Sequence, residues 1–275
     1  GGTAGLEAAC TAAEVGCNTF LLEKGSELGG LASLISKIPA KNRLADFPHY
    51  LMHRAEQLEN LYIFTNTEGT PENIRKFHPN IIVSSTGSAP LLPPIAGLKD
   101  RIDNENYNIY SILGMINHIN DFPKDLEGKK VVVVGGGAVG LDVVEFFADR
   151  NADISIVEMM DQIGRDLDPV SKNDTKAMMK KHNVHQLTKT ALLEVKDSSF
   201  LVKGDGEPYE LPFEYGFVCL GMRAQGQLYQ SLAEEFSSED VEIMNIGDSQ
   251  RARRIIDGTQ EGRNILTILE QRGYL

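Results

Sequence analysis

A glycine-rich pattern, GG-x-x-GL, occurs twice in this chain of 275 residues and constrains its fold more than any other feature. Residues 1–6 (GGTAGL) form the first copy, and residues 136–141 (GGAVGL) form the second copy 135 positions later. In each copy a helix-like stretch and a short β-rich run lead to a glutamate, Glu23 or Glu158, 18 residues after the last glycine. This repeat predicts an α/β fold with two Rossmann-like units.

The repeated pattern has a physical meaning, because a glycine turn between a strand and a helix lets the backbone approach a pyrophosphate. The N-terminus of the helix supplies unpaired N–H groups and partial positive charge to that anion. A glutamate at the end of the next strand is placed to accept hydrogen bonds from a ribose diol. We therefore expect two dinucleotide sites, which implies electron transfer between two nucleotides.

The second copy is complete in sequence, since the apolar run 130–134 (KVVVV) reads as a buried parallel strand that leads into Gly135. The helix after it, about 141–150, has an apolar face at helical spacing. The first copy starts at Gly1, which matches Gly136, so no strand precedes it in the given sequence. A helix packed through small residues without a ligand is the alternative there, and Glu23 argues against it.

Composition limits the function further. The formal charge of -12 disfavours nucleic acid or an anionic membrane surface as a partner. The apolar runs are too short to span a bilayer, and no signal peptide is visible, so a cytoplasmic location is the default expectation. The three cysteines, Cys10, Cys17 and Cys219, form neither a CxxC pair nor a metal-ligand spacing.

The order of the expected elements predicts a domain inserted into another. Residues 1–103 and 227–275 are expected to form the first domain, and residues 104–226 the second. In the first domain we expect helices over about 5–16 and 43–60, strands over 19–23, 61–64 and 81–87, a return strand over 241–248, and a helix from about 253. In the second we expect a helix over 169–182 and a β-meander over 186–210.

The return strand ends in Gly247 and Asp248, and two roles are open for that aspartate. Its carboxylate could accept a hydrogen bond from a sugar or ribityl hydroxyl at the first nucleotide. It could equally cap the helix that follows.

The same strings resemble a known group of proteins. Residues 1–6, 22–25, 28–30, 85–90 and 246–248 are similar to the FAD signatures of pyridine-nucleotide flavoproteins, whose FAD domain is interrupted by an NAD(P)H domain. Residues 156–168 and 253–257 resemble more closely the C-terminal half of NADH:flavin oxidoreductases with an Old Yellow Enzyme-like barrel. That group includes 2,4-dienoyl-CoA reductases, enoate reductases and trimethylamine dehydrogenase.

The resemblance implies that this chain is an electron-input module, taking hydride from NADH onto FAD. It also implies a barrel domain with FMN and an iron-sulfur centre outside this chain as the partner. Two alternatives stay open, namely a non-catalytic scaffold that holds ADP in place of FAD, and a disulfide reductase. The latter needs a redox cysteine pair that the sequence does not show.

The expected cofactor-binding residues fall into two sets, without any catalytic side chain or metal ligand. The FAD set is Gly1, Gly2, Gly5, Glu23, Lys24, Gly29, Gly30, Leu31, Thr86, Gly87, Gly247 and Asp248. The NADH set is Gly135, Gly137, Ala138, Val139, Gly140, Glu158 and Gly221. A carboxylate at position 158 would repel a 2'-phosphate, which favours NADH over NADPH.

Overall fold

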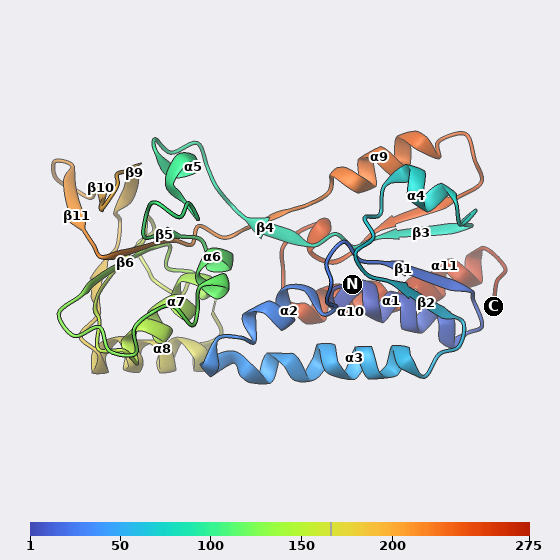
Figure 1. The fold of residues 1–275 in the computed structure, drawn as a ribbon, viewed down its shortest axis with the longest axis horizontal. Helices are drawn as coiled ribbons and strands as arrows, with labels where there is room; N and C mark the ends of the chain where they lie inside the picture. Colours follow the sequence, from blue (N-terminus) through green and yellow to red (C-terminus); the bar gives the residue numbers. More distant parts are fainter. Residues whose placement is uncertain (166) are drawn as a thin grey trace. The chain divides into compact units, whose positions relative to one another are not determined.

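The chain divides into two compact units in the computed structural model, which describes residues 1–165 and 167–275 (Figure 1). Asp166, within the string 156–168, therefore lies outside the described residues. Unit 1 comprises 1–37, 41–89 and 223–275, and unit 2 comprises 38–40 and 90–222. Unit 2 is thus inserted into unit 1, and the two crossing segments pair with each other as β4 (Ser88–Pro90) and β13 (Met222–Ala224).

The observed divisions fall near positions 89 and 222, whereas the sequence suggested 103 and 226. The first shift has a packing reason. Leu98 and Ile102, which follow the proline-rich crossing, are buried in the same cluster as Val132 and Phe200 of unit 2. Burial of these side chains in that core assigns the segment after the crossing to unit 2.

Unit 2 is built on a parallel sheet of five strands in the order β5-β12-β6-β7-β8. The strands are β5 (Ile109–Tyr110), β12 (Tyr215–Val218), β6 (Lys130–Val134), β7 (Asp153–Val157) and β8 (His185–Leu187). The helices are α5 (Leu98–Arg101), α6 (Ile112–Asn117), α7 (Ala138–Ala148) and α8 (Pro169–Lys181). The KVVVV run forms β6 at the centre of the sheet, and four of its residues are buried. This agrees with the expectation for a strand covered on both faces.

One face of this sheet is covered by an antiparallel meander, β9 (Ala191–Val195), β10 (Ser199–Lys203) and β11 (Tyr209–Pro212). Val195, Phe200 and Val202 of the meander join the buried cluster that contains Val157 of β7. The expected meander began at 186, but residues 185–187 form β8 and belong to the parallel sheet. On the other face, Phe147 of α7 lies against Phe217 of β12, with ring centroids 4.8 Å apart.

Unit 1 has two separate two-stranded parallel sheets, β1 with β2 and β3 with β14. The strands are β1 (Thr19–Leu22), β2 (Leu61–Phe64), β3 (Ile81–Ser84) and β14 (Glu242–Asn245). The helices are α1 (Thr3–Glu14), α2 (Gly30–Ile35), α3 (Asp46–Glu56), α4 (Pro71–Arg75), α9 (Gln227–Glu235), α10 (Ile255–Arg263) and α11 (Ile265–Gln271), with 3-10 turns η1 (Pro39–Ala45) and η2 (Gly247–Ser249). The α/β fold class with an inserted second domain is confirmed.

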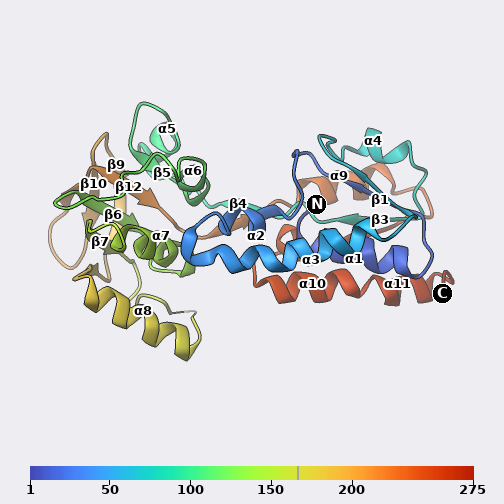
Figure 2. The same cartoon turned by 60° about the horizontal axis from the view of Figure 1, so that its bottom comes forward.

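Helix α1 lies at the centre of unit 1, between α3 and α10 (Figure 2). Leu6 and Cys10 of α1 pack with Leu51 of α3 in a buried cluster. α10 approaches closely because it carries glycines, and a Cβ built on Gly262 would lie 2.6 Å from the carbonyl oxygen of Ala4. The close contact of Gly262 with Ala4 shows that small residues let α1 and α10 pack at short distance.

The helix expected over 43–60 is shorter in the structure, because residues 39–45 form the 3-10 turn η1. Pro48 lies in the first turn of α3, where its missing N–H costs no intrahelical hydrogen bond.

Among the described residues, none of the helices combines the length and the apolar character that crossing a membrane requires.

Candidate dinucleotide-binding sites

The glutamate of unit 2 is held at the glycine turn by two backbone N–H groups. Glu158 follows β7, and its Oε2 accepts a hydrogen bond from the Gly136 N–H at 2.6 Å. Its Oε1 accepts a second hydrogen bond from the Met160 N–H at 2.7 Å. We call this pair of backbone hydrogen bonds the glutamate clasp. Each carboxylate oxygen can accept further hydrogen bonds, so the clasp fixes the group while leaving lone pairs for ribose hydroxyls.

The glutamate of unit 1 is held in the same way. The Oε1 of Glu23 accepts a hydrogen bond from the Gly25 N–H at 2.7 Å, and its Oε2 lies 2.9 Å from the Gly1 nitrogen. Gly25 and Met160 differ by the repeat interval of 135, as do Gly1 and Gly136. The repeat seen in sequence is therefore a repeat of hydrogen bonds as well.

A third matched bond closes each turn. The Gly29 N–H donates to the Gly1 carbonyl at 2.7 Å, and the Gly164 N–H donates to the Gly136 carbonyl at 2.7 Å. Gly29 and Gly164 both have positive φ, 100° and 66°, which favours glycine. The sequence prediction included Gly29 but missed Gly164, to which the interval of 135 points. It also missed Gly25 and Met160, which match only each other.

The glycines of the fingerprint are required by close backbone approach. A Cβ on Gly1 would lie 2.7 Å from Glu23 Oε2, and one on Gly136 would lie 2.9 Å from Glu158 Oε2. A Cβ on Gly140 would lie only 1.9 Å from the Gly135 carbonyl oxygen, where helix α7 meets the end of β6. These positions hold glycine because any side chain would displace backbone or the glutamate.

Both helices after the glycine turns begin without a side-chain cap among the described residues. Gly2 is the N-cap of α1 and Gly137 is the N-cap of α7. Gly137 and Ala138 are exposed, Val139 is half-buried, and nothing lies within 4 Å of a Cβ built on Gly137. Each helix start thus offers the free N–H groups and the partial positive charge that suit a pyrophosphate.

Several other expected residues of the FAD set gather around the start of α1. Gly2 forms a parallel bridge with Gly29, and a Cβ on Gly30 would lie 2.9 Å from the Gly2 Cα. A Cβ on Gly5 would lie 2.4 Å from the Ser85 Oγ, just after β3. The glycine loop 29–30 and the end of β3 therefore border the same helix start.

Asp248 is half-buried in the 3-10 turn η2 and does not cap the next helix. Its Oδ2 accepts a hydrogen bond from the Ser88 hydroxyl at 2.9 Å, and its Oδ1 accepts one from the Arg253 N–H at 3.0 Å. The helix α10 instead has Arg254 as N-cap, whose N–H donates to Asp257 at 3.1 Å. Of the two roles open for Asp248, the capping role does not apply.

Gly247 places Asp248 next to the first glycine turn. Its φ is 67°, and a Cβ there would lie 2.8 Å from the Ala4 Cβ of α1. The Thr86 hydroxyl donates to the Gln225 carbonyl, and the Gln225 N–H donates to the Gly87 carbonyl at 2.9 Å. The segment 86–88 is therefore bonded to Gln225 and, through the Ser88 hydroxyl, to Asp248 in the η2 turn.

Other expected residues have a less specific setting. Lys24 is exposed and Leu31 is half-buried at the start of α2. Gly221 has a φ of 102°, and its carbonyl accepts a hydrogen bond from the Leu91 N–H at 2.9 Å. Gly135 has a φ of 110° and ends β6 as expected for the first glycine of the fingerprint.

The electrostatics of Glu23 favour its ionised form. Burial alone would raise the pKa of this carboxyl, but the hydrogen bond from the Gly25 N–H and nearby positive charge, that of Lys24 among it, outweigh burial, so the pKa lies below its usual value. The group is therefore a carboxylate at neutral pH, the form that accepts hydrogen bonds from a diol.

The cysteines have no arrangement suited to redox chemistry. All three are free, and Cys10 and Cys219 are buried. Burial raises the pKa of Cys10 to about 11 and that of Cys219 to about 12, which disfavours the reactive thiolate. Among the described residues, no group of three or more histidine, cysteine or carboxylate side chains is placed to hold a metal ion.

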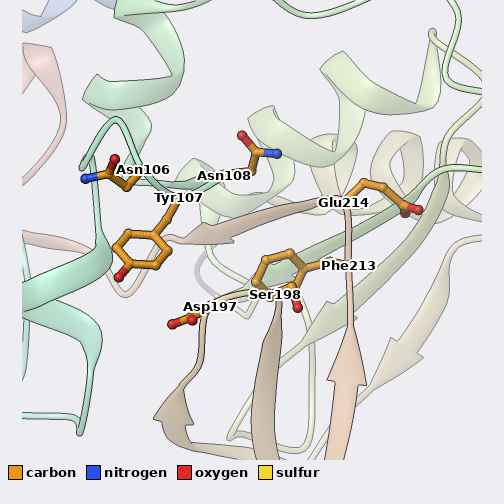
Figure 3. Close-up of a pocket in the computed structure, with 7 residues that line it drawn as sticks. All are labelled: Asn106, Tyr107, Asn108, Asp197, Ser198, Phe213 and Glu214. Carbon is orange, nitrogen blue, oxygen red and sulfur yellow. The ribbon is translucent and has the colours of Figure 1, made fainter.

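Unit 2 also contains a pocket, which Figure 3 shows. It is lined by Asn106, Tyr107, Asn108, Asp197, Ser198, Phe213 and Glu214. Asn108 and Glu214 directly precede β5 and β12, so this pocket borders the amino ends of the parallel strands. The glycine turn lies at their carboxyl ends, where ligands bind in open α/β sheets. We therefore assign no nucleotide to this pocket.

Comparison with known proteins supports the same interpretation. An NADH oxidase of Thermoanaerobacter brockii is 27% identical over 263 residues, which is 95% of this chain and 39% of the relative. A metal reductase of Desulforamulus reducens is 27% identical over 299 residues, covering 96% of this chain and 42% of the relative. The chain therefore spans about two fifths of the length of these relatives.

The fold is also found in solved structures. A 2-naphthoyl-CoA reductase in complex with 2-naphthoyl-CoA superposes with a TM-score of 0.81 at 23% identity, covering 96% of this chain and 38% of that chain. These matches confirm the resemblance to NADH:flavin oxidoreductases drawn from the sequence.

The family model for pyridine nucleotide-disulphide oxidoreductase matches residues 1–243. This match, with the relatives above, confirms the expected class of a flavin-linked, pyridine-nucleotide-dependent oxidoreductase and the expected pair of FAD and NADH as cofactors. The chain belongs to the pyridine nucleotide-disulphide oxidoreductase family.

Proposed function

We propose that this chain is the electron-input module of a larger flavoenzyme, with FAD bound in unit 1 and NADH bound in unit 2. The observation that carries the proposal is the matched glutamate clasp. In each of Glu23 and Glu158, one carboxylate oxygen lies at a backbone nitrogen of the glycine turn, and the other accepts a hydrogen bond from the N–H of the residue two positions further on. A repeated geometry of this kind in two units fits two ribose-binding sites rather than one.

In unit 1 the residues proposed to hold FAD fit its parts. The uncapped start of α1 at Gly2 suits the pyrophosphate, and Glu23 suits the adenosine ribose. Gly29, Gly30, Leu31 and Lys24 would border the same nucleotide, with Gly1 and Gly5 in the turn. Thr86 and Gly87 would approach the flavin side, and Asp248, adjoining Gly247, would accept from a ribityl hydroxyl.

In unit 2 the proposed NADH site uses the complete fingerprint. Gly135, Gly137 and Gly140 shape the turn, and the N–H groups of Ala138 and Val139 would meet the pyrophosphate. Glu158 would accept from both hydroxyls of the adenosine ribose, and Gly221 leaves room at the end of β12, since nothing lies within 4 Å of a Cβ built there.

When bound, FAD supplies a flavin that accepts hydride from the nicotinamide of NADH. The side chains of this chain then contribute binding and orientation, and hydride transfer requires no proton donor from them. This is why no catalytic side chain is proposed.

The final electron acceptor belongs to the rest of the protein. Because this chain spans about two fifths of its relatives, we propose that a barrel domain with FMN and an iron-sulfur centre receives the electrons from FAD. We also propose a cytoplasmic location for the protein.

The identity of the nucleotide in unit 1 tests this proposal. The purified chain should be yellow, or become yellow on incubation with FAD, and Glu23→Gln should weaken that uptake. A colourless chain that releases ADP on denaturation and does not take up FAD would favour the scaffold role and overturn the proposed function.

A further inference from the structure

The pocket of unit 2 is built from three loops at the amino ends of its parallel strands. The loop before β5 contributes residues 106–108, the β9–β10 turn contributes 197–198, and the β11–β12 turn contributes 213–214. The Phe213 N–H donates to the Ser198 carbonyl at 3.0 Å, which joins the two turns. The strands that follow the first and third loops, β5 and β12, pair with each other. The pocket is therefore formed before any ligand enters.

Two aromatic rings border the pocket and are held by packing on their other sides. Phe213 is buried and lies against Phe200, with ring centroids 4.5 Å apart. Tyr107 is half-buried against the same core cluster, and the Arg101 guanidinium lies 5.5 Å from its ring centroid. Figure 3 shows both rings among the polar side chains of the pocket. The pocket therefore presents fixed apolar surface beside hydrogen-bonding groups.

The polar side chains of the pocket have unused hydrogen-bonding capacity. Arg101 Nε donates to Asp197 Oδ1 at 2.8 Å, and the Lys130 N–H donates to Glu214 Oε2 at 2.6 Å. Within the described part of the chain, the second oxygen of each carboxylate and the hydroxyl of Ser198 have no hydrogen-bond partner. The two asparagine amides of the pocket add both donors and acceptors. A ligand that enters the pocket therefore meets both kinds of group.

The charge of the pocket disfavours an anion and does not require a cation. None of the seven described lining residues is basic, and a phosphate group would lie beside the two carboxylates. Arg101 already supplies a cation to both Asp197 and Tyr107. Hydroxyl groups both donate and accept hydrogen bonds, and two adjacent hydroxyls match one carboxylate. The site therefore suits a neutral ligand that is rich in hydroxyl groups.

We propose that this pocket binds a neutral polyol the size of one sugar ring, a ligand separate from the two nucleotides. A C–H face of the polyol lies on the Tyr107 ring, and two adjacent hydroxyls donate to the Asp197 carboxylate. The Ser198 hydroxyl and the Asn108 amide contact the remaining hydroxyls. The volume of about 350 Å³ admits a ligand of this size. Because the glycine turn lies at the opposite ends of the strands, the polyol leaves the proposed NADH site free.

Amide chemical shifts of the isotopically labelled chain provide the test. The chain is titrated separately with D-glucose, D-galactose, D-mannose and myo-inositol, and with inorganic phosphate and putrescine as an anionic and a cationic probe. At least one polyol should shift the amides of 106–108, 197–198 and 213–214, with a saturable dependence on its concentration. Phosphate and putrescine should leave these amides unchanged.

Two exposed aspartates of the meander provide a variant and its matched control. Asp197→Asn removes a charged acceptor from the pocket and should raise the Kd of the bound polyol at least about tenfold, as expected for the loss of a hydrogen bond to a charged group. Asp205→Asn, in the turn between β10 and β11, should leave that Kd within about twofold. Equal Kd values for the two variants would exclude Asp197 as the acceptor and contradict the proposed site.

Three results of the titrations would overturn the proposal. The first is the absence of shifts in the three loops with every polyol. The second is a shift of these amides by phosphate or putrescine. The third is a set of polyol shifts confined to residues 1–5 and 135–140, since the hydroxyls would then bind Glu23 or Glu158. The pocket and the nucleotide sites are read at different amides, so failure of this proposal leaves the proposed function untouched.

Discussion

Replacing Glu158 by glutamine should weaken NADH binding and reduce the discrimination against NADPH. The two oxygens of Glu158 accept the N–H groups of Gly136 and Met160, at 2.6 and 2.7 Å. In Glu158→Gln, whichever way the amide is turned, its NH2 group faces one of these N–H donors. One hydrogen bond to a charged acceptor is lost, and the ribose hydroxyls meet an uncharged group.

The size of the effect follows from these contacts. A hydrogen bond from a ribose hydroxyl to the charged Glu158 carboxylate would contribute about 1.5–3 kcal/mol, and the uncharged amide would lose most of it. At about 1.4 kcal/mol for each tenfold change in affinity, the Kd for NADH should rise by roughly tenfold to a hundredfold. The Kd for NADPH should rise less or fall, because the carboxylate no longer repels the 2'-phosphate.

Isothermal titration of both variants with each nucleotide measures these changes directly. Glu23→Gln is the matched control, since it removes the same clasp from unit 1 and should leave the Kd for NADH unchanged. If Glu158→Gln binds both NADH and NADPH within twofold of the unmodified chain, the assignment of Glu158 to the ribose is refuted.

Three further predictions concern stability and thiol reactivity. Gly140→Ala should lower the free energy of unfolding by about 1–3 kcal/mol in denaturant titrations, because its Cβ would meet the Gly135 carbonyl oxygen at 1.9 Å. Gly137→Ala is the control, since a Cβ there has open space and should change the free energy of unfolding by less than about 0.5 kcal/mol. The pKa of Glu23 lies below its usual 4.5, so its contribution to stability is present above that pH and is lost as pH falls through the lower folded value. The stability difference between the unmodified chain and Glu23→Gln should therefore shrink in acid, and a difference that widens would contradict this. In the native protein, thiol reagents should modify Cys17 first, and Cys10 and Cys219 only on unfolding. The number of reactive thiols should not change after NADH is added. A thiol gained on reduction would instead indicate a redox disulfide.

The local signals of the sequence predicted much of each nucleotide site. The run 130–134 and the glycines after it identified β6 and the turn, because a buried strand and a close backbone approach restrict residue types strongly. The interval of 135 would also have led from Gly29 to Gly164, which the prediction did not use, whereas Gly25 and Met160 match only each other. Their roles depend on backbone N–H groups, which leave no preference in side-chain chemistry at Met160.

Non-local packing could not be predicted in the same way. The separation of β1 from β3 depends on pairing between segments far apart in sequence, and the strand β5 has only two residues, too few to show a periodic pattern. The domain boundary moved because Leu98 and Ile102 find their burial in the core of unit 2. The role of Asp248 required the positions of Ser88 and Arg253, which no local pattern supplies.

The most direct test of the central claim is an anaerobic titration of the FAD-loaded chain with NADH, followed by the absorbance of the oxidised flavin. Electron input through two nucleotide sites predicts that the absorbance falls in proportion to added NADH and is lost at one NADH per flavin. Flavin that stays oxidised in excess NADH, while calorimetry shows NADH bound, would contradict the claim.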